Sequence, residues 1–103
     1  MSPRLDALLE IVKTRPHDPF PHYGLALEYK SLGRRDDAAQ AFRELLKNHP
    51  NYVPGYLQAG MMFMEVGLHD EARQALEQGA QVAAQYGDGH ARSEILAALD
   101  AIP

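Results

Sequence analysis

The 103 residues of this chain include no cysteine. Disulfide bonds, thiolate nucleophiles and zinc sites with cysteine ligands are therefore excluded. Long hydrophobic runs are also missing, since no apolar stretch approaches the roughly 20 residues that a membrane-spanning helix needs. Positive charge is scarce: 10 lysines and arginines stand against 14 aspartates and glutamates, for a formal net charge of -4. That balance argues against a broad surface for nucleic-acid phosphates. We expect neither a nucleic-acid nor a membrane partner.

What is present suits one small helical domain. A chain of this length can form a single core, and its abundant alanine favours helix over sheet. The first apolar stretch is interrupted by Asp6 and Glu10, so no signal-peptide pattern is visible and a cytoplasmic location is expected.

An internal repeat organises the sequence between residues 18 and 85. When the chain is shifted by 34 positions, the second half of this stretch lies on the first. The strict identities gather at one turn and at the helix start that follows it: Gly33/Gly67, Asp36/Asp70, Ala38/Ala72, Gln40/Gln74 and Ala41/Ala75. Two consecutive structural units of the same design are therefore predicted.

Hydrophobic periodicity, prolines and glycines predict six helices and no strand. We expect them at about 3–14, 18–32, 36–48, 52–66, 70–86 and 89–101. Their starts are predicted at acidic N-caps, namely Asp18, Asp36 and Asp70. The fifth helix should be longer than its counterpart, because Ala84 replaces the proline that the repeat would place there. Ala38 and Ala72 are expected to be buried where paired helices approach most closely.

These residues resemble the tetratricopeptide repeat family, whose unit is a hairpin of two antiparallel helices. The first unit carries the family's pattern at Leu25, Ala26, Tyr29, Gly33, Ala38, Phe42, Leu45 and Pro50, and the second carries it at Tyr56, Ala59, Gly60, Phe63, Gly67, Ala72, Leu76 and Gly79. His22 departs from the pattern, since a tryptophan or tyrosine is usual there. The resemblance implies an all-α fold, an α-solenoid of helix hairpins in a right-handed superhelical stack. It divides a single domain into a capping half-repeat helix (1–17), two repeats (18–51 and 52–86) and a C-terminal capping helix (87–103).

The five histidines do not form a metal-binding or catalytic pattern. His17, His49 and His69 are expected near turns at the surface, and His22 is expected to fill the aromatic packing position. No nucleophile, phosphate loop or paired acid and base is recognisable. We therefore predict that the chain is not an enzyme and uses no cofactor or metal.

The resemblance also implies where a partner would bind, because the first helix of each unit lines a concave groove in this family. An apolar stripe with a polar rim on these helices predicts the partner-binding residues Tyr23, Leu27, Lys30, Leu57, Gln58, Met61, Met64 and Glu65. The methionines would supply an adaptable apolar surface. Two interpretations of the stripe remain open: a binding groove, or core covered by the last helix.

The lysine and asparagine positions with which some family members hold an acidic C-terminal tail are occupied by Tyr23, Leu27, Leu57 and Met61. An apolar or mixed ligand is thus predicted. The expected function is a protein–protein interaction adaptor that binds a peptide or helix segment. The alternatives are a scaffold that forms a homodimer through the same stripe and an accessory subunit of a larger complex.

Overall fold

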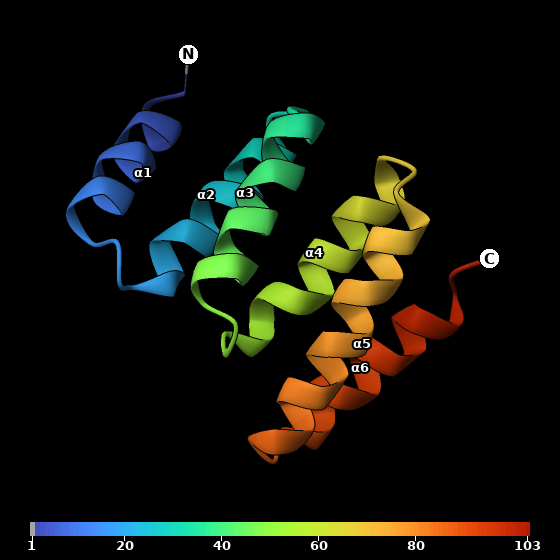
Figure 1. Cartoon of the computed structure of the whole chain (residues 1–103). Coiled ribbons are helices and arrows are strands. Elements are labelled where there is room, and N and C mark those ends of the chain that lie inside the picture. Colours follow the sequence, from blue (N-terminus) through green and yellow to red (C-terminus); the bar gives the residue numbers. More distant parts are fainter. Residues whose placement is uncertain (1) are drawn as a thin grey trace.

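The computed structural model describes residues 2–103, so Met1, the first residue of the predicted capping segment, lies outside the described part. It contains six helices, and no strand occurs between residues 2 and 103 (Figure 1). Their bounds are α1 (Pro3–Thr14), α2 (Pro19–Ser31), α3 (Arg35–Asn48), α4 (Val53–Glu65), α5 (His69–Gln85) and α6 (Gly89–Asp100). The predicted helices are confirmed, including the greater length of α5, which has 17 residues against 14 in α3.

Two of the three predicted acidic N-caps are wrong. Asp18 does cap α2, because its side chain accepts a hydrogen bond from the Phe20 amide. In contrast, α3 and α5 begin one residue before the predicted caps, and neither has a side-chain cap. Asp36 and Asp70 already lie in the first helical turn. There a negative charge still interacts favourably with the helix dipole without accepting the capping bond.

Three glycines end helices with the same backbone geometry. Gly33, Gly67 and Gly87 adopt φ values of 75°, 81° and 69°, which residues other than glycine rarely adopt. After each glycine the next amide bonds back to a carbonyl five residues earlier, as in Leu68 N to Phe63 O at 2.8 Å. This is the Schellman arrangement of a helix C-terminus. The turn between α5 and α6 therefore has the form of the turns within the two hairpins.

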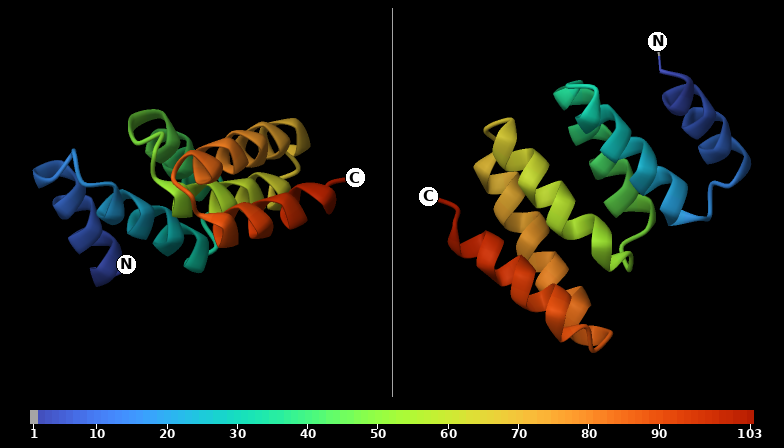
Figure 2. Two further views of the ribbon diagram at one scale, coloured as in Figure 1. Left: turned by 90° about the horizontal axis from the view of Figure 1, so that it is seen from below. Right: turned by 180° about the vertical axis from the view of Figure 1, so that it is seen from behind.

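The helices pack in chain order, and α6 also contacts α4. Figure 2 (left) shows α3 and α5 along one side of the molecule and α2 and α6 along the other. Ala38 and Ala72 are completely buried, as predicted, because small side chains let neighbouring helices approach closely. The core has one cluster around Phe42 and Phe63 and a second, nearer the C-terminus, around Leu76 and Ile95.

The outer side of α6 is polar and exposed. His90 and Ser93 lie on it and remain in contact with solvent. Only Ile95 of this helix is fully buried, facing the second cluster. A polar outer face is what a terminal helix of a stacked array needs to stay in water.

Candidate partner-binding groove

A hollow lies where α2, α4 and α6 come together at the start of α4. Its volume is about 330 Å³, and it is lined by Tyr23, Val53, Pro54, Leu57, Gln58, Asp88, Ala91, Glu94 and Ile95. We call it the Tyr23 hollow. Apolar side chains form most of its wall, and the two carboxylates come from α6 and the residue that precedes it. Three predicted site residues, Tyr23, Leu57 and Gln58, are thus brought together.

A second hollow lies further along the same pair of helices, α4 and α6. Its volume is about 360 Å³, and its lining residues are Gly60, Met61, Met64, Glu65, Leu76, Ala98 and Ala101. We call it the Met61 hollow. Met61 is an exposed apolar side chain of this hollow, with 42% of its surface exposed. Three more predicted site residues, Met61, Met64 and Glu65, line this hollow.

Two predicted site residues, Leu27 and Lys30, line neither hollow. Leu27 is half-buried and packs against the Phe42 cluster. Tyr23 and Met64 also contact that cluster, whereas Leu57 packs against the Ile95 cluster. The stripe is therefore part core and part open surface along its length, and neither of the two interpretations describes all of it.

The wall formed by α6 was missed at the level of the sequence. Ala91, Ile95 and Ala98 lie on one apolar side of the last helix, which was predicted as a cap that either leaves the stripe open or covers it, and not as one wall of a groove. Their spacing of four and three residues places them on a single face. That face covers α4 from residue 53 to residue 65 and makes one side of both hollows. The covering is partial, since the hollows remain open beside it.

Charge in the groove is negative. Among their lining residues the Tyr23 hollow carries Asp88 and Glu94 and the Met61 hollow carries Glu65, and neither is lined by a lysine or arginine. Asp88 caps α6 by accepting a hydrogen bond from the Ala91 amide at 3.0 Å. Glu94 lies 3.1 Å from the Nε2 atom of His90. Burial raises the pKa of Tyr23, so its hydroxyl stays neutral and available as a donor.

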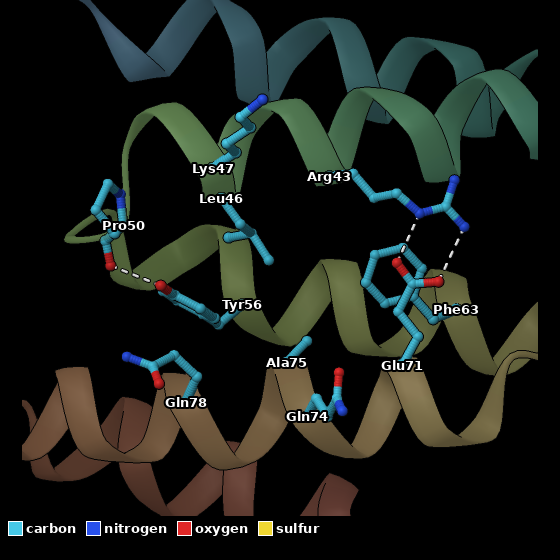
Figure 3. Close-up of a pocket in the computed structure, with 10 residues that line it drawn as sticks. All are labelled: Arg43, Leu46, Lys47, Pro50, Tyr56, Phe63, Glu71, Gln74, Ala75 and Gln78. Carbon is cyan, nitrogen blue, oxygen red and sulfur yellow. Dashed lines mark hydrogen bonds and ion pairs between the residues drawn. The ribbon is translucent and has the colours of Figure 1, made fainter.

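A third hollow, of about 460 Å³, lies between α3 and α5 with α4 as its floor (Figure 3). At one end Arg43 donates two hydrogen bonds to the Glu71 carboxylate, at 2.6 and 2.9 Å. These bonds lower the pKa of Glu71 and raise that of Arg43. At the other end the Tyr56 hydroxyl donates to the Pro50 carbonyl at 2.6 Å. Because these polar groups already satisfy one another, they serve to join the helices of the two hairpins.

The histidines do not gather into a metal centre. Between residues 2 and 103, no group of three or more histidine, aspartate or glutamate side chains has an arrangement suited to a metal ion. His17 and His69 are exposed, as predicted. His49 lies at the turn after α3, as predicted, but it is half-buried, because its ring packs against that of His22 with the centroids 5.4 Å apart. None of the helices in the described part of the chain is long and apolar enough to cross a membrane.

Comparisons with known proteins agree with the repeat pattern. A model of the tetratricopeptide repeat matches residues 22–52. A TPR repeat-containing protein of Pseudomonas aeruginosa is 33% identical over 73 residues, which cover 71% of this chain and 70% of the relative. A tetratricopeptide repeat domain protein of Salinibacter ruber, solved by NMR, has a TM-score of 0.76 and 32% identity over 82% of this chain and 85% of its own. The fold is also similar to that of PcrH in complex with the chaperone binding region of PopD, with a TM-score of 0.85 at 18% identity over 95% of this chain and 74% of PcrH.

Proposed function

The chain belongs to the tetratricopeptide repeat family, and on that premise we propose that it is an adaptor that binds a segment of a partner protein in the groove along α4. The observation that carries this proposal is the succession of two apolar hollows on one helix. The Tyr23 hollow involves residues 53–58 of α4 and the Met61 hollow involves residues 60–65. An extended peptide or a helix lying along α4 could place one apolar side chain in each hollow.

An interaction role agrees with one of the similar folds. PcrH was solved with a region of another protein bound to it. At 18% identity that likeness concerns the fold alone. The binding residues proposed for this chain are therefore argued from its own side chains. They are Tyr23, Leu57, Gln58, Met61, Met64 and Glu65, together with Leu27 and Lys30 of α2.

The charges of the groove favour a particular ligand chemistry. Carboxylates from Glu65, Asp88 and Glu94 border apolar walls, and no cationic side chain lines either hollow. A segment with apolar anchors and a lysine or arginine beside them would complement this surface, because opposite charges at a rim steer association and fix register. We thus propose a cytoplasmic, non-catalytic binding module that recognises an apolar and basic segment without a cofactor.

Selection from a displayed library of random peptides tests the groove while the partner is still unidentified. The wild type should enrich peptides with two apolar residues and a net positive charge. The variant Leu57→Ser/Met61→Ser should not retain them, because both hollows lose a wall. A matched control is Leu32→Ser/Leu68→Ser, which alters two exposed leucines near the turns and should bind as the wild type does.

Two results of the same selection would contradict the proposal. Equal retention by the groove variant and the wild type would place binding elsewhere, and enrichment of acidic peptides would contradict the ligand chemistry. Thermal melts of both variants must accompany the selection, because Leu57 is half-buried. Its loss should cost about 1–2 kcal/mol of unfolding free energy, which leaves the helices folded under the conditions of selection.

Self-association is the second candidate function, and the exposure of Met61 favours it. This side chain, 42% exposed beside an apolar hollow, could pack against its counterpart in a second copy related by a two-fold axis. Light scattering at several protein concentrations distinguishes the two functions. A mass that doubles with concentration in the wild type but not in Met61→Ser would support the scaffold.

A further inference from the structure

Two histidine rings meet where the start of α2 faces the end of α3. His22 lies in the first turn of α2, and His49 is the residue that ends α3. Their ring centroids are 5.4 Å apart, with the planes inclined at 43°. The Nε2 atom of each ring is buried without a hydrogen-bond partner, and no other buried side-chain nitrogen or oxygen in residues 2–103 has this property. Buried polar groups are nearly always paired, so two adjoining exceptions require an explanation.

The surroundings of the His22 ring oppose a positive charge. Burial lowers the pKa of His22, and the adjoining His49 lowers it further. Three groups act in the other direction: the Pro16 carbonyl, the carboxylate of Asp18 before α2 and the carboxylate of Glu44 on α3. Burial and the neighbouring ring outweigh them, since the pKa remains below its ordinary value. Both rings can pack as neutral groups, whereas a proton on His22 would place a charge beside a second imidazole in a poorly solvated site.

The pair is connected to the groove through two tyrosines. The Tyr52 amide donates a hydrogen bond to the His49 carbonyl at 3.1 Å. The Tyr52 ring meets the Tyr23 ring edge-on, with 5.5 Å between centroids. Tyr23 follows His22 on α2 and lines the Tyr23 hollow. The turn from residue 49 to residue 52 is therefore held against α2 by two ring contacts. One of them involves His22, whose imidazole can be protonated.

We propose that the His22–His49 contact is an acid-sensitive joint, which holds the Tyr23 wall of the groove in place near neutral pH and releases it when the His22 ring is protonated. This inference rests on the proposed function only in taking the Tyr23 hollow as part of the binding surface. The joint itself is a property of the free protein and can be measured without a partner.

The sign of the pH effect follows from the direction of the His22 pKa. The folded protein binds a proton at this site less readily than the unfolded chain, whose histidine pKa is about 6.5. The stabilisation is complete above that pH and is lost as the pH falls through the lower folded pKa. For each unit by which the folded pKa is lowered, the ratio of folded to unfolded protein falls up to about tenfold.

Urea unfolding between pH 7.5 and 5.5 tests the joint. The wild-type midpoint should fall with pH, and His22→Phe, which keeps an aromatic ring but cannot be protonated, should fall distinctly less. His69→Gln is the control, because it removes an exposed histidine and should retain the wild-type slope. An unchanged slope in His22→Phe would overturn the proposal.

An NMR titration of the wild type keeps the proposal testable if His22→Phe does not fold. The imidazole signals of His22 should shift with a midpoint below about 6.5. The ring signals of Tyr23 and the methyl signals of Leu57 should shift over the same range. Groove signals that do not follow those of His22 would overturn the joint. A failure of the groove to bind any peptide would leave these signals unaffected, so it concerns the proposed function alone.

Discussion

The two hairpins, α2 with α3 and α4 with α5, fill the same 34-residue frame with different side chains. In the first, Ala26 lies at the position that Gly60 takes in the second, and Phe42 lies at the position of Leu76. The smaller residue of the second hairpin is required, because a Cβ atom on Gly60 would lie 2.5 Å from the Leu76 side chain. Both positions carry the smaller residue in the second hairpin, which fits a closer approach of α4 to α5 there.

His22 and Tyr56 occupy the same position of the repeat, so they show what changes when an imidazole replaces a phenol there. Tyr56 is 3% exposed, and its hydroxyl donates to the Pro50 carbonyl. His22 occupies the corresponding place in the first hairpin, 34 residues earlier, and its Nε2 atom has no partner. The second hairpin therefore buries its aromatic group with all polar atoms satisfied. The first retains a group that can be protonated, so the two hairpins should respond differently to acid.

The largest effect expected from a test of this comparison is that of Phe42→Ala. Phe42 is completely buried, so truncation removes its apolar contacts and leaves a cavity. The free energy of unfolding should fall by about 3–5 kcal/mol. Urea unfolding at pH 7.5 measures it, with Leu76→Ala as the matched change in the second hairpin, where about 2–5 kcal/mol is expected. A loss below about 1 kcal/mol for Phe42→Ala would mean that the two hairpins do not share one mode of packing.

Gly79→Ala should have the next largest effect, and only the second hairpin offers this test. Its new Cβ atom would lie 2.4 Å from the Cβ atom of Tyr56. Both atoms are attached directly to helix backbones, so α4 and α5 would have to separate, at a cost of about 1–3 kcal/mol. The control is Gly89→Ala, where no atom lies within 4 Å of the added group. Equal midpoints for the two variants in urea would contradict the close approach at Gly79.

Tyr56→Phe should have the smallest effect and sharpens the comparison with His22. It removes the hydrogen bond to the Pro50 carbonyl while keeping the ring, and about 0.5–1.5 kcal/mol of unfolding free energy should be lost. Tyr86→Phe, on a tyrosine that is 60% exposed, should change stability by less than about 0.5 kcal/mol. Thermal melts compare the two variants. A neutral result for Tyr56→Phe would show that its hydroxyl bonds equally well to water.

Most of the fold could be predicted from the sequence because the signals that define it are local. The glycines at 33, 67 and 87 end helices by their own conformational freedom, and prolines and apolar periodicity mark the remaining boundaries. The errors at Asp36 and Asp70 concern one position in a helix start. Both α3 and α5 begin two residues after the glycine of the preceding turn. Because neither start has a side-chain cap, the geometry of that turn determines where the helix begins. An acidic residue close to a start is therefore a weaker indicator of the cap than the geometry of the preceding turn.

The residues that line the two hollows were predicted less completely, because a groove is formed by segments distant in the sequence. Tyr23 and Leu57 come together only when α2 and α4 are placed side by side, and the wall supplied by α6 depends on how the last helix turns after Gly87. Nothing in the local pattern distinguishes a helix that covers a groove from one that borders it. The contact between His22 and His49 could not be predicted for the same reason, since the two residues lie in different segments of the sequence.

The sequence by itself determined the period, the number of helices and the small residues at which they pack, because these depend on backbone propensity and on which side chains avoid water. Only the tertiary structure decided how far the apolar stripe on α4 stays open, which carboxylates border it, and that two imidazoles share a buried site. Those properties depend on the distance and angle between helices, to which every side chain in the interface contributes. No short segment of the sequence contains that information.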